Sequence, residues 1–259
     1  MHKSHKNGPT VIAVCGKGGV GKTSISAALV KILSGNSQNK VLAIDADPAV
    51  GLSTALGIKV AKTVDDVRTD LIHQVKSGNA GDKVEMLSRL DYELFSALEE
   101  QQNLAFLAIG RPEKEGCYCQ VNSLLKDVIA SIVDNFDYVI IDGEAGIEQV
   151  NRRVMKKVSH LVLVSDASAK GLNVVKTIRQ ISDAAVDYEK AGLILNRIRG
   201  EDERALVSVP PELDCLGWIP EDDAIRNCDI QGESILEIAD CPAIQATKEC
   251  MVSMGLVFN

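Results

Sequence analysis

Aromatic side chains, basic charge and long apolar runs are all scarce in this sequence. Only 3% of its residues are Phe, Trp or Tyr, so a core must be built from Val, Ile, Leu and Ala. That bias suits parallel strands that are buried on both faces. The formal net charge of −8 argues against a general surface for DNA or another polyanion, and we expect no nucleic-acid partner.

The sequence has no recognisable segment for membrane insertion or export. Its longest apolar runs stay well below the roughly 18 residues that cross a bilayer. The opening MHKSHKNGPT carries positive charges without the apolar stretch of a secretory signal. We therefore expect a cytoplasmic protein without a membrane partner. Because no linker, repeat or low-complexity tract interrupts the chain, we expect residues 10–259 to be one domain. We expect residues 1–9 to be a flexible N-terminal tail.

Short apolar runs alternate with helical patterns from one end of the chain to the other. Seven runs have the length of buried strands: Val11–Cys15, Val41–Ile44, Leu104–Ile109, Tyr138–Ile141, Leu161–Val164, Leu193–Leu195 and Leu216–Ile219. Apolar residues at helical spacing predict helices that end near Gly35, over Val121–Val133 and over Leu172–Ala185. Residues 58–100 read as polar helices inserted between the second and third strands. The alternation predicts an α/β fold, with a mostly parallel central sheet and helices on both faces.

The stretch GKGGVGKTS, residues 16–24, follows the first predicted strand and opens the first helix. It matches the pattern GxxxxGK[ST] in the strand–loop–helix context of a P-loop NTPase. Glycines let the backbone wrap a triphosphate at the positive end of a helix, Lys22 would reach the β- and γ-phosphates, and Thr23 would bind Mg²⁺. The other predicted phosphate-binding positions are Gly16, Gly18, Gly19, Val20, Gly21 and Ser24.

Three carboxylates follow two other predicted strands. Asp142 ends the run YVIID, whereas Asp45 and Asp47 lie in AIDADP after the second strand. Ligands of parallel sheets bind at the carboxyl ends of the strands, where all three residues are expected. Asp142 fits the aspartate on the magnesium side of a nucleotide hydrolase, and Asp45 fits an outer position beside the metal.

The loop contains an additional lysine, Lys17, directly after its first glycine. KGGVGKT resembles the deviant Walker A loop of the MinD/ParA/nitrogenase iron-protein ATPases. The resemblance implies an ATP-dependent homodimer in which Lys17 contacts the nucleotide of the partner chain. AIDADP resembles the switch I segment, which implies that Asp47 orients the attacking water. IIDGEAGIE resembles the switch II segment, whose aspartate corresponds to Asp142. The implied catalytic set is thus Lys17, Lys22, Asp47 and Asp142, acting on ATP and Mg²⁺.

Two later segments extend the resemblance over nearly the whole chain. LILNRIRG resembles the strand whose asparagine recognises adenine, which implies that role for Asn196 with Arg197 beside it. GWIPEDD resembles the segment whose backbone closes over the base, which implies contacts from Pro220, Glu221 and Asp222.

A pair of cysteines, Cys117 and Cys119, lies in EGCYCQVN just before the 121–133 helix. A thiol near a helix N-terminus is stabilised as a thiolate, the form that binds metals. One chain supplies two thiolates, and a homodimer could supply four. The other cysteines are predicted to be reduced and to fill the core: Cys15, Cys215, Cys228, Cys241 and Cys250.

Within the family, the CYC motif resembles the CooC-type ATPases that mature nickel-containing carbon monoxide dehydrogenases. The resemblance implies that the dimer binds Ni²⁺ and delivers it to an apo carbon monoxide dehydrogenase or acetyl-CoA synthase. Thiolates also bind Zn²⁺ or Cu(I), so the metal stays open between nickel and zinc. Two alternatives also stay open: a MinD/ParA-like positioning or regulatory protein that ATP switches, and an iron–sulfur-bridged reductase component. The switch II segment has no cysteine, and the C-terminal tail has a weak apolar face, which count against the reductase and against membrane cycling.

Overall fold

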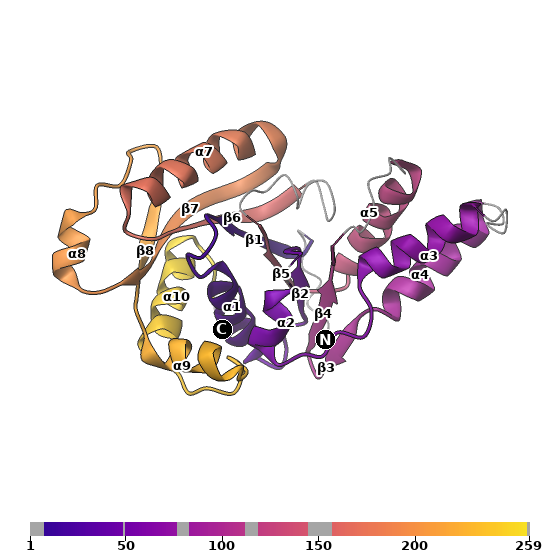
Figure 1. Cartoon of the computed structure of the whole chain (residues 1–259), viewed down its shortest axis with the longest axis horizontal. Coiled ribbons are helices and arrows are strands. Elements are labelled where there is room, and N and C mark those ends of the chain that lie inside the picture. The colour runs from indigo at the N-terminus through magenta and orange to yellow at the C-terminus, as the bar shows by residue number, and fades with distance from the viewer. Residues whose placement is uncertain (1–7, 49, 77–82, 112–118, 145–156, 258–259) are drawn as a thin grey trace.

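A central sheet organises the fold of the computed structural model, which describes residues 8–48, 50–76, 83–111, 119–144 and 157–257. Its eight strands lie in the order β3-β4-β2-β5-β1-β6-β7-β8 (Figure 1). Every neighbouring pair is parallel except β3 and β4. The strands are β1 (Thr10–Gly16), β2 (Val41–Asp45), β3 (Glu99–Gln101), β4 (Leu104–Ala108), β5 (Tyr138–Asp142), β6 (Lys157–Ser165), β7 (Asp187–Ile198) and β8 (Cys215–Pro220).

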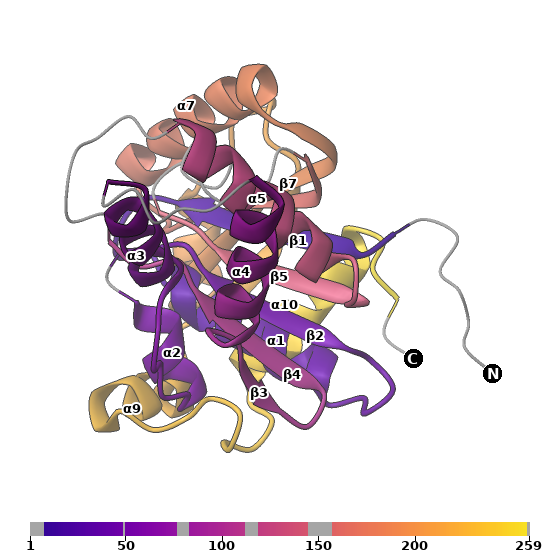
Figure 2. The same cartoon turned by 90° about the vertical axis from the view of Figure 1, so that its right-hand side faces the viewer.

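Helices cover both faces of the sheet (Figures 1 and 2). One face packs against α3 (Val64–Lys76), α4 (Lys83–Phe95), α5 (Cys119–Val133) and α7 (Ala169–Ala185). The opposite face packs against α1 (Lys22–Ser34), α2 (Gly51–Leu56), α9 (Asp223–Gln231) and α10 (Pro242–Ser253). The short helix α8 (Glu201–Leu206) follows β7. The predicted α/β architecture with a mostly parallel sheet is therefore confirmed.

The alternation of side chains along β1 shows how the two faces become two cores. Val11, Ala13 and Cys15 belong to the core under α3, α4, α5 and α7, whereas Ile12 and Val14 belong to the core under α1 and α10. Successive strand residues point to opposite faces, so a central strand must be apolar throughout. Aliphatic side chains make up most of both cores, as the shortage of aromatic residues predicts.

The cysteines outside the CYC motif follow the prediction only in part. Cys15, Cys228 and Cys250 are buried, Cys241 is half-buried, and Cys215 is exposed. Burial was the wrong expectation for Cys215, because this residue begins β8, the last strand at one edge of the sheet.

Residues 58–100 contain the helices α3 and α4, as predicted, and also a strand that the pattern did not reveal. The strand β3 is only Glu99–Gln101 and pairs antiparallel with β4. Its three residues are polar and show no apolar alternation, so nothing in its own sequence marks it as a strand. It forms because the turn at Gln102, with φ 52°, folds this segment back along β4.

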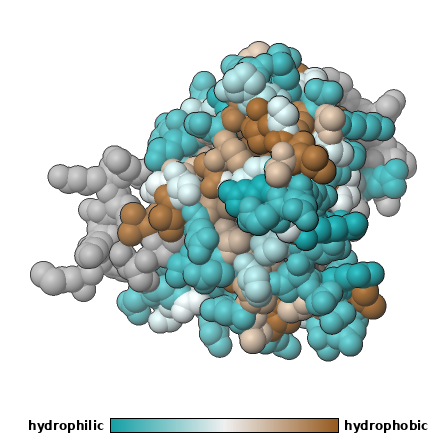
Figure 3. Space-filling model, turned by 90° about the vertical axis from the view of Figure 1, so that its left-hand side faces the viewer, coloured by the Kyte–Doolittle hydropathy of each residue, from teal (hydrophilic) through white to brown (hydrophobic). Residues whose placement is uncertain are grey.

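The surface of the described part of the chain mixes hydrophilic and apolar residues. Figure 3 shows the side that carries α8, where apolar patches lie among larger hydrophilic areas. Leu206 of α8 is one exposed apolar residue, at 86% exposure. Within the described segments, no helix combines the length and the apolar character needed to cross a membrane.

Asn103 holds the β3–β4 turn to the loop after α1. Its side-chain Nδ2 donates to the carbonyl oxygens of Ser34, Asn36 and Asn39 at 3.0, 3.2 and 2.9 Å. Replacing Asn103 by Asp removes the donor and sets an acceptor against three carbonyl oxygens. We expect N103D to lower the free energy of unfolding by about 2 kcal/mol, measured by urea denaturation. The control is Q102N at the exposed neighbour Gln102, because Asn suits the same turn conformation and should leave the stability unchanged. Equal stability of N103D and wild type would contradict the role of Asn103.

Candidate functional site

The loop between β1 and α1 has two positions that only glycine suits. Gly16 has φ 154°, and a β-carbon there would collide with the carbonyl oxygen of Val164 on β6. Gly21 precedes α1 with φ 90°, and a β-carbon there would collide with the side-chain amide of Asn196 on β7. The loop is therefore pressed against two strands. Its backbone lies at the start of α1, where free amide groups favour an anion.

Two side chains from the end of β7 hold the loop in place. Asn196 Nδ2 donates to the carbonyl oxygen of Val20 at 2.8 Å, and Arg197 Nη1 donates to that of Gly19 at 3.0 Å. Val20 is buried, whereas Gly18 and Gly19 are exposed. Sequence reasoning assigned Asn196 to the base; in the structure its amide nitrogen supports the phosphate loop.

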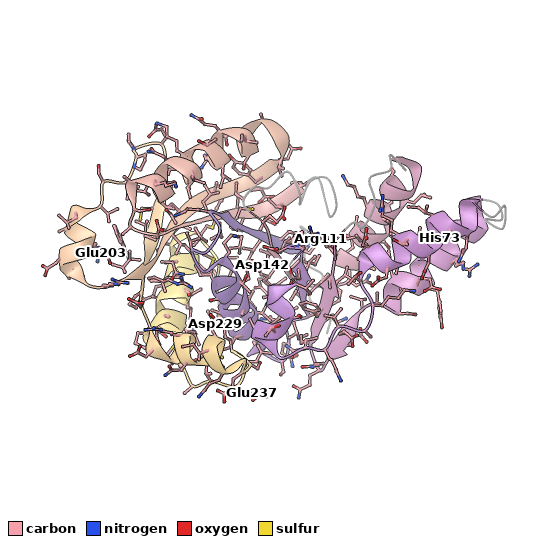
Figure 4. The ribbon with its side chains drawn as sticks, in the orientation of Figure 1. His73, Arg111, Asp142, Glu203, Asp229 and Glu237 are labelled. Carbon is pink, nitrogen blue, oxygen red and sulfur yellow. The ribbon has the colours of Figure 1, made fainter. Side chains whose placement is uncertain are left out.

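Asp142 at the end of β5 accepts hydrogen bonds from the first turns of α1. Thr23 Oγ1 donates to one carboxylate oxygen at 2.8 Å, and Ser26 Oγ donates to the other at 3.0 Å. Figure 4 shows Asp142 in the interior of the fold, and the residue is 1% exposed. Burial raises the pKa of Asp142 to about 6, although these hydrogen bonds and the charge of Lys22 act in the opposite direction.

Asp45 lies directly opposite Asp142 in the register between β2 and β5. It is fully buried, and its two oxygens accept hydrogen bonds from the backbone N–H groups of Asp47 at 3.1 Å and Leu52 at 2.9 Å. Burial, followed by the negative charge of Asp142, raises the pKa of Asp45 to about 7. The predicted gathering of carboxylates at the carboxyl edge thus holds for Asp45 and Asp142, with Asp47 half-buried beside them.

The two loop lysines point to different partners. Lys22 is 8% exposed, and its Nζ lies 3.4 Å from the carbonyl oxygen of Lys17. Lys17 Nζ lies 3.4 Å from a carboxylate oxygen of Asp166, and both side chains are partly exposed. Asp166 follows β6 and also accepts hydrogen bonds from Ser168, the N-cap of α7. Sequence reasoning missed Asp166, although a carboxylate directly after an apolar run was the available signal.

A pocket of about 490 Å³ adjoins the loop on the side of α9 and α10. Of the residues assigned to the nucleotide from sequence, it brings together Ser24, Asn196, Arg197, Pro220, Glu221 and Asp222. The other predicted nucleotide-binding residues belong to the phosphate loop and the start of α1 and do not line this pocket: Gly16, Gly18, Gly19, Val20, Gly21, Lys22 and Thr23. At the rim, Arg199 Nε donates to Glu221 Oε2 at 2.8 Å and links the ends of β7 and β8.

Sequence reasoning missed the far wall of this pocket. That wall consists of side chains from two helices, among them Asp229 of α9, which Figure 4 labels. The available signal was the spacing of the α9 residues three and four apart after GWIPEDD, which puts them on one helix face. The residues that were missed are Ile225, Arg226, Asp229, Ile230, Ala243 and Thr247.

The predicted metal ligands are the two cysteines of the CYC motif, Cys117 and Cys119. Cys117 lies outside the described residues, and Cys119 is the first residue of α5, where the backbone of Cys119 is described but its side chain is not. Among the described residues, no three His, Cys, Asp or Glu side chains form a cluster that could hold a metal ion.

The raised pKa of Asp45 predicts a pH dependence of stability. Because the folded state holds this proton more tightly than the unfolded chain, the free energy of unfolding of the nucleotide-free protein should fall as the pH rises from about 4 to about 7. In D45N this contribution disappears, so urea denaturation at pH 4.5, 6 and 8 should show a shallower decline than in wild type. The exposed Asp91 provides the control D91N, which should follow wild type. A slope in D45N as steep as that of wild type would contradict the prediction.

Comparisons with known proteins agree with this geometry. Residues 11–235 match the CobQ/CobB/MinD/ParA nucleotide binding domain. An uncharacterized ATP-binding protein of Methanocaldococcus jannaschii is 35% identical over 225 residues, which cover 86% of this chain and 88% of that protein. The carbon monoxide dehydrogenase accessory protein CooC of Rhodospirillum rubrum is 27% identical over 249 residues, with 88% of this chain and 90% of that protein covered.

A solved structure extends the match to the fold. The cell division ATPase MinD of Pyrococcus furiosus superimposes with a TM-score of 0.63 at 26% identity, covering 95% of this chain and 98% of that chain. The family match spans the glycine loop, both buried aspartates and the ends of β7 and β8. The chain therefore belongs to the CobQ/CobB/MinD/ParA nucleotide-binding domain family.

Proposed function

We propose that this chain is a magnesium-dependent ATP hydrolase that acts in the cytoplasm as an ATP-dependent homodimer. The observation that carries the proposal is the pair of buried carboxylates, Asp45 and Asp142, beside the phosphate loop. Two neighbouring carboxylates out of water favour a cation, and the Thr23 hydroxyl adds an oxygen of the kind that Mg²⁺ binds. The donor set therefore fits magnesium, with Thr23 as ligand and the carboxylates behind it. Bound magnesium would neutralise charge on the phosphate oxygens.

The residues of the chain itself supply the rest of the site. Lys22 reaches the β- and γ-phosphates from its nearly buried position under the loop. Asp47, beside Asp45, orients the attacking water, which is the role that the family resemblance assigns to it. The nucleoside occupies the adjoining pocket, whose lining includes Ser24, Pro220 and Glu221.

Lys17 completes the site of the partner chain. In one isolated chain its ammonium group lies beside Asp166, which precedes α7. The ammonium group of Lys22 already lies against the loop backbone, at the carbonyl oxygen of Lys17. An exposed ion pair of this kind contributes little to stability, so Lys17 can leave Asp166 at small cost. A second copy that faces the loop would then receive the charge on its own nucleotide, as an arginine finger does in other P-loop hydrolases.

Substitution of the two loop lysines separates binding from hydrolysis. We expect K22A to abolish nucleotide binding, because the variant lacks the Lys22 ammonium group that contacts the phosphates within one chain. We expect K17A to bind ATP but to hydrolyse it about a hundredfold more slowly and to stay monomeric with ATP. Equilibrium dialysis, phosphate release and light scattering measure the three effects, with K170A on α7 as an exposed control. Full ATPase activity and ATP-dependent dimerisation in K17A would contradict the role of Lys17.

We further propose that the dimer carries Ni²⁺, or Zn²⁺, as cargo to an apo enzyme of the carbon monoxide dehydrogenase or acetyl-CoA synthase type. Cys119 begins α5, a helix of 15 residues, and Cys117 precedes it by two positions. Positive potential at a helix N-terminus favours thiolates, and two copies would supply four. The similarity to a carbon monoxide dehydrogenase accessory protein supports this choice of client.

A positioning or regulatory ATPase is the second candidate, supported by the similarity to MinD. Against it, α10 buries Ile244, Cys250 and Met251 in the core, so the apolar face of the last described helix is already occupied. An iron–sulfur-bridged reductase remains the third class, and a brown, oxygen-sensitive cluster in the purified dimer would identify it.

Metal binding distinguishes these candidates directly. We expect wild type with ATP to bind about one Ni²⁺ per dimer with four thiolates, and the double variant C117A/C119A to bind none. Equilibrium dialysis followed by metal analysis gives the ratio. The matched control is C215A, which removes an exposed thiol far along the chain. Nickel retained by C117A/C119A at the wild-type ratio would exclude the cargo proposal, and ATP-dependent binding to liposomes would favour the positioning class.

A further inference from the structure

One carboxylate, that of Asp222, joins the N-termini of two helices. Its Oδ1 accepts a hydrogen bond from the backbone N–H of Ala224 at 2.8 Å and caps α9. Its Oδ2 accepts one from the backbone N–H of Ala243 at 3.0 Å, in the first turn of α10 and 21 positions further along the chain. Family resemblance gave Asp222 a contact with the base through its backbone. The structure gives its side chain a different task.

The start of α10 depends on this distant carboxylate. Its first residue, Pro242, has no N–H group, so Ala243 provides the first backbone donor of the helix. The N-cap position holds Cys241, whose sulfur is a weak acceptor, and its thiol is hydrogen-bonded to Asp222. Burial opposes ionisation of Asp222, but the N–H groups around it outweigh that effect and lower its pKa. The acceptor is therefore a carboxylate at neutral pH.

The two helices that Asp222 joins form one wall of the pocket. From α9 the wall receives Ile225 and Asp229, and from α10 it receives Ala243 and Thr247. The α1 residues Ser24, Ile25 and Ala28 also line the pocket, and α1 packs with α10 in the same apolar core. The distance between α9 and α10 thus sets the shape of the side of the pocket away from the phosphate loop.

We propose that Asp222 is a positioning residue for nucleoside binding: by capping α9 and α10 with one carboxylate, it fixes the pocket wall that faces the base and ribose. The proposal rests on the proposed function, because it takes the pocket as the nucleoside site. It does not involve the phosphates, which bind at the other end of the site. Loss of Asp222 should therefore weaken the binding of a nucleotide but leave the binding of a free phosphate chain unchanged.

The test compares ADP with inorganic pyrophosphate, which shares the diphosphate but has no nucleoside. The variant is D222N, because Asn has one acceptor oxygen and can cap only one of the two helices. By isothermal titration calorimetry with Mg²⁺, we expect D222N to bind ADP about tenfold more weakly than wild type and to bind pyrophosphate equally well. The neighbouring D223N, in the first turn of α9, is the matched control and should leave both affinities unchanged.

A second variant separates positioning from simple stabilisation. D222N/C241S gives α10 its own N-cap hydroxyl, so both helices are capped but no longer joined. We expect this variant to regain the wild-type melting temperature and to keep the weak ADP binding of D222N. Recovered ADP affinity in D222N/C241S, or an equal loss of ADP and pyrophosphate in D222N, would overturn the role of Asp222. If wild type bound neither ADP nor pyrophosphate, the proposed function itself would be wrong. If wild type bound both and D222N had the same two affinities, only the role of Asp222 would be wrong.

Discussion

The parallel register of β2 with β5 is the constraint on which the site depends. It sets Asp45 opposite Asp142 at the same edge of the sheet, in an interior that water does not reach. Four hydrogen bonds partly offset the cost of removing these carboxylates from water. Two come from α1, one from Asp47 before α2 and one from Leu52 within α2. The two helices are consequently tied to the strand ends by the groups that favour a cation.

The phosphate loop depends on the other half of the sheet. The β6 backbone excludes any side chain at Gly16, and the end of β7 holds the loop through Asn196 and Arg197. The carboxylates on one side of β1 and these loop supports on the other belong to strands that are far apart in the sequence but adjacent in the sheet. A change in the loop therefore reaches strand ends on both sides of β1.

The local sequence was enough to predict the parts of this site that each rest on one short segment. The glycine loop and the strand ends at Asp45 and Asp142 follow from apolar runs and from a motif with a fixed spacing. Helical spacing likewise indicated α1, α5 and α7, whereas α2, α8, α9 and α10 were not predicted. The contacts of Asp166 with Lys17 and of Asp222 with Ala243 were not predictable in this way. Each joins residues far apart in sequence, and each depends on how the chain packs. The strand β3 was not predicted for a related reason. Pairing with β4 makes it a strand, and its own polar residues carry no strand pattern.

The same three-residue strand has a consequence for how copies of the chain can meet. A sheet edge invites another chain to add a strand, and proteins discourage this with edge strands that are short and charged. Here the β3 edge is only three residues long and presents Glu99 and Glu100, so it is a poor template for an intermolecular sheet. Self-association by sheet extension is thus disfavoured at this border, and a productive pairing of two copies is left to other surfaces, such as the one that carries the glycine loop.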